Sequence, residues 1–319
     1  MGTLYIDRKD MHVKLDGNAL AFYANGVRDG VVPVGPLKRV VVIGKVTLDT
    51  PVLHRLADEN VSVIFLSGKR LRFRGMLHGR LHNNGLLRLK QYEKSLSGFA
   101  AEASRDIVMR KISKQREFLV TAKAERPDAG MRITAAINTL SRVMETLHKR
   151  ESTDMETLRG LEGGAGAAYF SAYTRLFPPS LRFGGRNRRP PRDPVNAVLS
   201  LCYTMLHFEM LREVELLGLD PTIGFYHCFD YGRESLACDL VEPYRPDVDR
   251  FVWDVFRKRV FTGRDFSMDD ERPGCYLKKK SRSRFYPVYE KWAGVMRPQW
   301  TDEVRRLARR IMDGQDTVS

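Results

Sequence analysis

The hydrophobic pattern changes its period part-way along the chain, and this change constrains the fold more than any other sequence feature. From Leu4 to about Leu77, short apolar runs such as Val40–Ile43 are separated by turn pairs such as Asn25-Gly26. Such runs and pairs are typical of β-strands joined by tight turns. Beyond Gly85, apolar residues recur at helical spacing to near the C-terminus. We therefore predict an α+β fold, with a small N-terminal β-rich, β-sandwich-like domain followed by a larger all-α domain.

The same pattern sets the expected domains and elements. Residues 1–85 form the β-rich domain, residues 86–312 the helical domain, and residues 313–319 a frayed tail. The β-rich domain is expected to contain strands near 4–6, 12–15, 19–23, 31–34, 39–43, 61–66 and 71–76, and one helix from Thr50 to Asn60. The helical domain is expected to contain one or two helices over 86–123, then helices over 131–149, from the capping box Thr153-x-x-Glu156, from Asp193-Pro194, over 234–260 and over 287–312.

The charge balance limits the partners worth considering. Lysine and arginine number 54 against 39 acidic residues, which gives a formal charge of +15. This excess attracts polyanions, and nucleic acid is the first candidate. The four cysteines have no C-x-x-C spacing, and no apolar run approaches the roughly 20 residues that span a bilayer. We therefore expect a cytoplasmic protein with no membrane partner.

Glu162 lies in an unusual glycine-rich stretch that the capping pattern places on a helix. Gly163, Gly164 and Gly166 follow it directly. Each glycine inside a helix costs about 1 kcal/mol relative to alanine, so this helix is weakened unless a close approach is needed there. The simpler alternative is tight packing between helices, with Glu162 an ordinary solvated residue.

A second unusual stretch contains two carboxylates and a histidine. Asp239 and Glu242 are three residues apart, so on a helix they share a face and repel unless a cation or base lies between them. Pro243 follows, so the helix kinks or ends at Glu242. The alternatives are a helix end with solvated acids, and a His227 that only packs. Together, Glu162, His227 and a second carboxylate suit a hard divalent cation, which polarises phosphodiesters and activates hydroxyls.

Two basic clusters could contact a sugar-phosphate backbone. The first is a predicted loop over residues 182–192, which contains glycine and proline pairs. It carries five arginines and no acidic residue. Guanidinium groups favour bidentate contacts to phosphates. The second, Lys278 to Arg284, is a charge run of a kind that is more often only solvated. Neither cluster implies sequence reading, because phosphate contacts fix position.

Four stretches, in order and spacing, resemble the family of CRISPR-associated spacer-acquisition integrases. They are Leu161–Phe170, Pro194–Ser200, Gly224–His227 and Leu236–Pro246. Weaker matches are Arg88-x-x-Gln91-Tyr92 and Lys111-Ile112-x-x-x-Gln115. The resemblance covers essentially the whole chain, including the β-then-α order, and four motifs in sequence are far more specific than any one.

The resemblance implies a catalytic set of Glu162, His227, Asp239 and Glu242. It assigns Glu162, His227 and Glu242 to a bound Mg²⁺ or Mn²⁺. Many members carry aspartate at the position of Glu242, so the division of labour between Asp239 and Glu242 is open. The residues expected to bind DNA are Arg186, Arg188, Arg189, Arg245, Lys278, Lys279 and Lys280.

The implied activity is that of a metal-dependent DNA endonuclease and integrase of CRISPR adaptation. It joins the 3′-hydroxyl ends of short duplex DNA to a CRISPR repeat by transesterification, and it can act on branched DNA. The implied partners are a second copy of the chain, joined through the β-rich domain, which also contacts DNA, and a small companion subunit. The alternatives are a non-catalytic basic nucleic-acid-binding scaffold and a metal-dependent phosphohydrolase, although the phosphate-binding motif G-x-x-x-x-G-K-[ST] is missing from the sequence.

Overall fold

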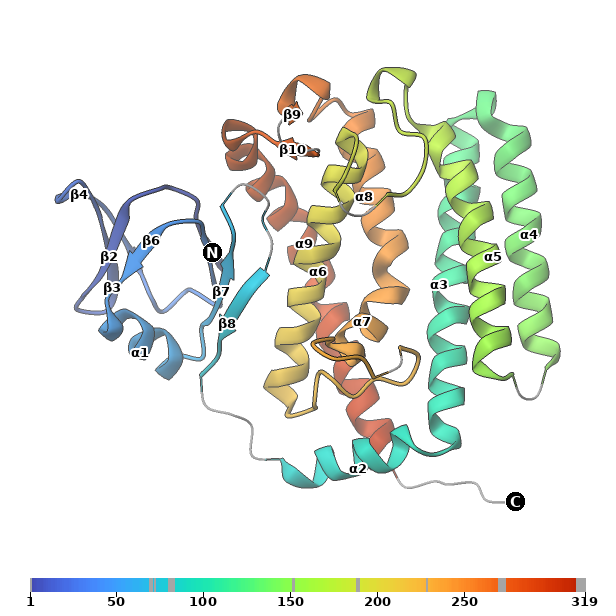
Figure 1. The fold of residues 1–319 in the computed structure, drawn as a ribbon, viewed down its shortest axis with the longest axis horizontal. Helices are drawn as coiled ribbons and strands as arrows, with labels where there is room; N and C mark the ends of the chain where they lie inside the picture. Colours follow the sequence, from blue (N-terminus) through green and yellow to red (C-terminus); the bar gives the residue numbers. More distant parts are fainter. Residues whose placement is uncertain are drawn as a thin grey trace. The chain divides into compact units, whose positions relative to one another are not determined.

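The computed structural model describes residues 2–68, 71, 73–79, 84–150, 153–187, 190–227, 229–268 and 274–313. Its contacts divide the chain into two compact units (Figure 1). The first unit is Met1–Asn83 with Arg282–Gly294, and the second is Asn84–Ser281 with Val295–Ser319. The helical pattern predicted that residues 282–294 belong to the helical domain, whereas the contacts assign them to the first unit. Of the tail predicted at residues 313–319, residues 314–319 lie outside the described residues.

The first unit contains two four-stranded sheets. One has the order β1 (Thr3–Ile6), β5 (Arg39–Ile43), β7 (Ser62–Leu66) and β8 (Phe73–Leu77), with β8 antiparallel to β7 and the others parallel. The other has the order β4 (Val27–Pro33), β3 (Ala19–Ala24), β2 (Met11–Asp16) and β6 (Val46–Leu48). Both sheets and α1 (Thr50–Asp58) contribute to one buried core that includes Val13, Leu20, Val40, Val42 and Leu56. The strand-rich N-terminal fold is thus confirmed; the short strand β6 was missed.

Residues 282–294 belong to the first unit because their side chains bind its first sheet. Tyr286 stacks on Tyr5, with ring centroids 4.2 Å apart, and the Tyr5 hydroxyl donates to Glu290 at 2.7 Å. Tyr286 also donates to Asp7 at 2.8 Å. These residues are part of α9 (Lys279–Met312), which begins earlier than the predicted residue 287.

The second unit is helical, as predicted. Its elements are α2 (Gly85–Ser95), α3 (Gly98–Glu125), α4 (Gly130–Lys149), α5 (Met155–Tyr173), α6 (Pro194–Leu217), α7 (Ser235–Val241), α8 (Arg245–Arg257), parts of α9, and the unpredicted hairpin β9 (Phe266–Met268) and β10 (Cys275–Leu277). Figure 1 shows α3, α4 and α5 side by side, and α6 is buried along most of its length. No helix among the described residues is long and apolar enough to cross a membrane.

Helix ends near the site follow local chemistry. Asp193 caps α6 as predicted, because its carboxylate accepts from the Asn196 backbone N–H at 2.8 Å. The predicted capping box from Thr153 is wrong: α5 is capped by Asp154, which accepts from the Thr157 N–H at 2.8 Å. The helix break at Pro243 is confirmed, since α7 ends at Val241 and a 3-10 turn leads into α8.

Candidate active site

Two carboxylates from distant elements meet on one lysine. Glu162 lies on α5, Glu242 begins the 3-10 turn after α7, and Lys111 lies in the middle of α3. The Lys111 ammonium donates to Glu162 Oε1 and, at 2.6 Å, to Glu242 Oε2. Two oxygens that bind the same nitrogen are at most about 6 Å apart, so the structure brings these two predicted site residues together.

The charges in this cluster stabilise one another. The second oxygen of Glu242, Oε1, accepts a hydrogen bond from Arg245 Nε at 2.7 Å. Only 7% of the Glu242 side chain is exposed. Burial acts to raise the pKa of Glu242, but the charges of Arg245 and Lys111 hold that pKa well below its ordinary value. Burial likewise acts to lower the pKa of Lys111, whereas Glu242 and Glu162 raise it. The Glu242 carboxylate and the Lys111 ammonium are therefore both charged at neutral pH.

Asp239 organises the loop that carries His227. Its side chain is fully buried, and Oδ2 accepts from the backbone N–H groups of Phe225 at 2.6 Å and Tyr226 at 3.0 Å. Oδ1 accepts from the His227 N–H at 2.9 Å and lies 2.7 Å from His227 Nδ1. A Cβ on Gly224 would lie 2.8 Å from Oδ2, so this approach requires glycine. Both carboxylate oxygens of Asp239 are thus committed, and His227 is held through Nδ1 with Nε2 as its remaining nitrogen.

Tyr226 interacts both with Asp239 and with the carboxylate pair Glu162 and Glu242. Its backbone N–H binds Asp239, and its carbonyl accepts from Arg159 at 3.2 Å. Burial, together with the charges of Glu162 and Glu242, raises the pKa of its phenol. The phenol therefore lies within electrostatic reach of both carboxylates. Tyr226 was not among the predicted site residues, although it stands next to His227 in the stretch Gly224–His227.

The donor set fits a hard divalent cation, with one difference from the expected arrangement. Glu162 and Glu242 already converge on a cation, and Asp239 orients the imidazole of His227 in the way that a metal-binding histidine is usually held. Within the described part of the chain, no three His, Cys, Asp or Glu side chains converge closely enough to hold a metal ion together. The site residues therefore form two separate pairs, Glu162 with Glu242 and Asp239 with His227. Lys111 lies between the two carboxylates of the first pair.

The glycines after Glu162 do not serve helix packing within the chain. A Cβ added to Gly163, Gly164 or Gly166 would meet no atom within 4 Å. The alternative of tight packing is therefore wrong for contacts within the described residues. Instead, the space next to these three glycines is open.

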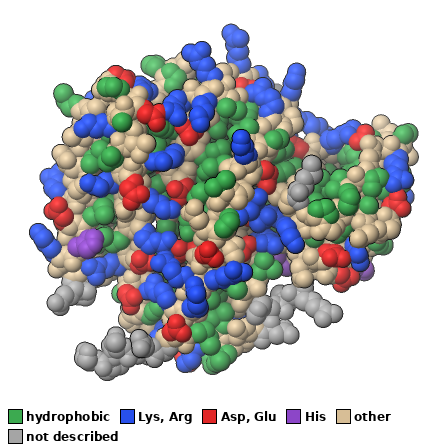
Figure 2. Space-filling view, turned by 180° about the vertical axis from the view of Figure 1, so that it is seen from behind, with side chains coloured by type: hydrophobic (Ala, Val, Ile, Leu, Met, Phe, Trp, Pro, Cys, Tyr) green, Lys and Arg blue, Asp and Glu red, His purple; other side chains and the backbone are tan. Residues whose placement is uncertain are grey.

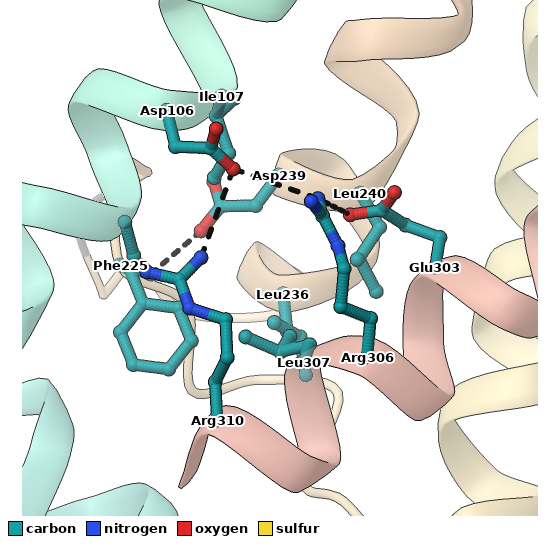
Figure 3. Close-up of a pocket in the computed structure, with 11 residues that line it drawn as sticks. Asp106, Ile107, Phe225, Leu236, Asp239, Leu240, Glu303, Arg306, Leu307 and Arg310 are labelled. Carbon is teal, nitrogen blue, oxygen red and sulfur yellow. Dashed lines mark hydrogen bonds and ion pairs between the residues drawn. The ribbon is translucent and has the colours of Figure 1, made fainter. Parts of the chain in front are cut away.

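A small pocket lies behind the His227 loop (Figure 3). Phe225 and Asp239 form part of its wall, and Arg306 and Arg310 of α9 point across it toward Asp106 of α3, with nitrogen–oxygen distances of 3.6 and 3.7 Å. Its volume of about 20 Å³ is enough for a water molecule. The C-terminal turns of α9 thus support the loop from behind.

The predicted DNA-binding residues differ in their surroundings. Arg186 donates to Asn196 at 2.8 Å and Ser200 at 3.2 Å, and its guanidinium lies 5.3 Å from the ring centroid of Tyr203. Arg245 binds Glu242 and lies 4.7 Å from the same ring. Both arginines therefore have partners inside the second unit, and Arg188 and Arg189 lie outside the described residues.

The lysine cluster is exposed. Lys278 is the N-cap of α9, and Lys279 and Lys280 form its first turn. Positive charge at a helix N-terminus is unfavourable in isolation, because the helix dipole is positive there. Figure 2 shows further lysine and arginine side chains spread over the face turned to the viewer.

Comparison with known proteins decides the family. A sequence model described as CRISPR associated protein Cas1 matches residues 4–291. A protein from Thermodesulfovibrio yellowstonii named CRISPR-associated endonuclease Cas1 1 is 50% identical over 319 residues and covers 100% of both chains. The chain belongs to the Cas1 family.

Other Cas1 proteins agree with this assignment. A CRISPR-associated endonuclease Cas1 2 from Rhodospirillum rubrum is 33% identical over 92% of this chain and 90% of its own. A solved Cas1 structure from Thermotoga maritima has a TM-score of 0.84 at 24% identity, covering 100% and 99% of the two chains, and shows the same fold. The predicted family and fold class are confirmed, and the relatives' names agree with the predicted activity class.

Proposed function

We propose that this Cas1 protein is a metal-dependent DNA endonuclease and integrase that joins the 3′-hydroxyl ends of short duplex DNA to a CRISPR repeat by transesterification. One observation carries the proposal: Glu162 and Glu242 converge on a single cation, Lys111, next to a loop that holds His227 through Asp239. The name of the closely similar Thermodesulfovibrio yellowstonii protein, an endonuclease, supports it.

Glu162, Glu242 and Nε2 of His227 would hold Mg²⁺ or Mn²⁺. Such a cation would supply Lewis-acid chemistry, which would lower the pKa of a hydroxyl nucleophile and neutralise charge on the phosphoryl group. Asp239 acts as a positioning residue, because its carboxylate fixes both the backbone and the imidazole of His227. Arg245 holds one oxygen of Glu242 and so fixes the direction of the other. The hydrogen bonds of Asp239 and Glu242 support this proposed division of labour.

The DNA strands would contact the lysine cluster at the start of α9. Lys278, Lys279 and Lys280 stand where the helix dipole adds to their charge, and a phosphate backbone would neutralise both. The open glycine surface of α5 beside Glu162 would allow a strand to approach the helix closely. The internal partners of Arg186 and Arg245 favour a supporting role for these two residues, while Arg188 and Arg189 stay candidates for phosphate contacts.

The active form would be a homodimer that joins a small companion subunit. Strand β4 is the last strand of its sheet, and Val27 and Val31 are 70% and 44% exposed on it. The outer side of β4 has no neighbouring strand among the described residues, and its two exposed valines could pack against a second chain, here a second copy. A solved complex of Cas6-RT-Cas1 with Cas2 contains a chain of the same fold, at a TM-score of 0.82, and this favours Cas2 as the companion. We place this assembly in the cytoplasm, in agreement with the free thiols of Cys202, Cys238 and Cys275.

Strand transfer on a branched DNA tests the proposal, because this reaction needs only one DNA substrate. The wild-type protein and Glu162→Gln are compared in Mg²⁺, Mn²⁺ and chelator, with and without the companion subunit. Glu156→Gln is a matched control, since Glu156 is an exposed carboxylate on the first turn of the same helix.

We expect metal-dependent joining by the wild type and by Glu156→Gln, and loss of joining by Glu162→Gln with DNA binding retained. Salt-sensitive DNA binding with no metal-dependent joining or cutting in any condition would refute the proposal and favour the non-catalytic scaffold.

A further inference from the structure

Lys111 occupies the point on which the carboxylate pair converges. Its ammonium binds Glu162 Oε1 and Glu242 Oε2, and 13% of its side chain is exposed. We propose that Lys111 is a tethered cation that holds this pair in the absence of divalent metal, and that metal binding releases its ammonium toward a DNA phosphate. Metal and DNA would then bind cooperatively through one side chain. This inference rests on the proposed function.

The metal and the lysine compete because they need the same oxygen. Arg245 takes Oε1 of Glu242, so Oε2 is the oxygen that a metal ion would use, and Lys111 binds that atom at 2.6 Å. An ammonium and a divalent cation on one oxygen repel each other. A metal ion that binds Glu242 must therefore displace Lys111 from Oε2, and the repulsion between the two cations then also weakens the contact of Lys111 with Glu162.

The released ammonium needs another anion. A mostly buried charge without a partner is strongly disfavoured, and the four-carbon stem of lysine allows its ammonium to move while the backbone of α3 stays in place. Asp247, another acidic residue that contacts α3, is already bound by Lys114, one turn along the helix from Lys111, at 2.6 Å. In the proposed reaction, the phosphate next to the metal is the anion that the substrate brings to this position.

Mn²⁺ binding by Lys111→Met tests the competition. The dissociation constant of Mn²⁺ is measured by electron paramagnetic resonance for the wild type, Lys111→Met, Lys111→Arg and Lys114→Met, with and without branched DNA. Without DNA, we expect Lys111→Met to bind Mn²⁺ about tenfold more tightly, equivalent to about 1.4 kcal/mol, and Lys111→Arg and Lys114→Met to resemble the wild type. DNA should narrow this difference, because it strengthens Mn²⁺ binding more in the wild type than in Lys111→Met.

A second measurement needs no mutation and so avoids any folding defect. Acetylation of Lys111 and Lys114 by an amine-reactive ester is quantified by mass spectrometry with and without Mn²⁺. We expect Mn²⁺ to increase the labelling of Lys111 and to leave that of Lys114 unchanged, and we expect added DNA to protect Lys111 again.

Equal or weaker Mn²⁺ affinity of Lys111→Met, or labelling of Lys111 that Mn²⁺ does not change, would overturn the inference. If DNA leaves the difference in Mn²⁺ affinity between the wild type and Lys111→Met unchanged, the proposed movement of the Lys111 ammonium to a DNA phosphate would be overturned. A failure of the proposed function gives a different result. In that case Glu162→Gln would not reduce the Mn²⁺ binding of the protein, and the proposed metal site itself would be wrong.

Discussion

Replacing Asp239 with asparagine should disrupt both the stability of the second unit and its metal affinity. Each carboxylate oxygen of Asp239 accepts from two donors, Oδ2 from Phe225 and Tyr226 and Oδ1 from two nitrogens of His227. In Asp239→Asn, one of these oxygens becomes an NH₂ group that faces the donors. One hydrogen bond to a charged group is lost if the NH₂ group takes the place of Oδ1 and His227 Nδ1 becomes its acceptor, and two are lost otherwise; at about 1.5–3 kcal/mol each, the destabilisation is roughly 1.5–6 kcal/mol.

The assay is urea unfolding of the metal-free protein, followed by tryptophan fluorescence, together with Mn²⁺ titration of the folded variant. Because His227 loses the group that orients it, we expect Mn²⁺ affinity to fall by about 10–100-fold. Asp247→Asn is the control: its ion pair with Lys114 is partly exposed, so its loss should cost about 1 kcal/mol or less. An Asp239→Asn variant as stable as Asp247→Asn, with wild-type Mn²⁺ affinity, would refute this account of Asp239.

Three further predictions concern other parts of the molecule. Burial raises the pKa of Asp249 to about 6, against hydrogen bonds from Tyr203 and Tyr169. Because the pKa of Asp249 is higher in the folded than in the unfolded protein, its protonation stabilises the fold, fully below about pH 4 and no longer above about pH 6. Between these pH values, the free energy of unfolding of the wild type should fall by up to about 3 kcal/mol relative to that of Asp249→Asn, as measured by urea unfolding. A difference that stays constant with pH would contradict the assignment. Replacing Lys279 and Lys280 with glutamine should reduce the slope of log affinity against log salt by about 0.9 for each lost phosphate contact; an unchanged slope would remove them from the DNA interface. Val27→Lys, on the exposed edge strand β4, should convert the proposed dimer to monomer in light scattering, and a dimer that persists in this variant would place the interface elsewhere.

Local sequence patterns predicted most of the helices and strands, whereas they could not predict which residues each helix packs against. The change of period separates the strand-rich and helical parts, and Pro243 marks the helix break. However, α9 is one helix of 34 residues, and its pattern does not reveal that residues 282–294 pack on the first sheet through contacts such as Tyr286 with Tyr5. Thr153 and Asp154 are adjacent capping residues, and sequence alone could not choose between them.

The candidate site shows the same limit. The three-residue spacing suggested that Asp239 and Glu242 share a face, but the 3-10 turn after Val241 gives Glu242 different partners. Asp239 turns to the His227 loop, and Glu242 binds Lys111, which is 131 residues away in the chain. Such long-range pairs depend on packing between α3, α5 and α7, which no local pattern encodes.

The most direct test of the central claim is a crystal structure with Mn²⁺, in which anomalous scattering locates the ion. The account predicts one Mn²⁺ within about 2.0–2.6 Å of oxygen atoms of Glu162 and Glu242 and of Nε2 of His227, with the Lys111 ammonium withdrawn from both carboxylates. Mn²⁺ bound elsewhere, or Lys111 still bridging the two carboxylates at saturating Mn²⁺, would contradict it.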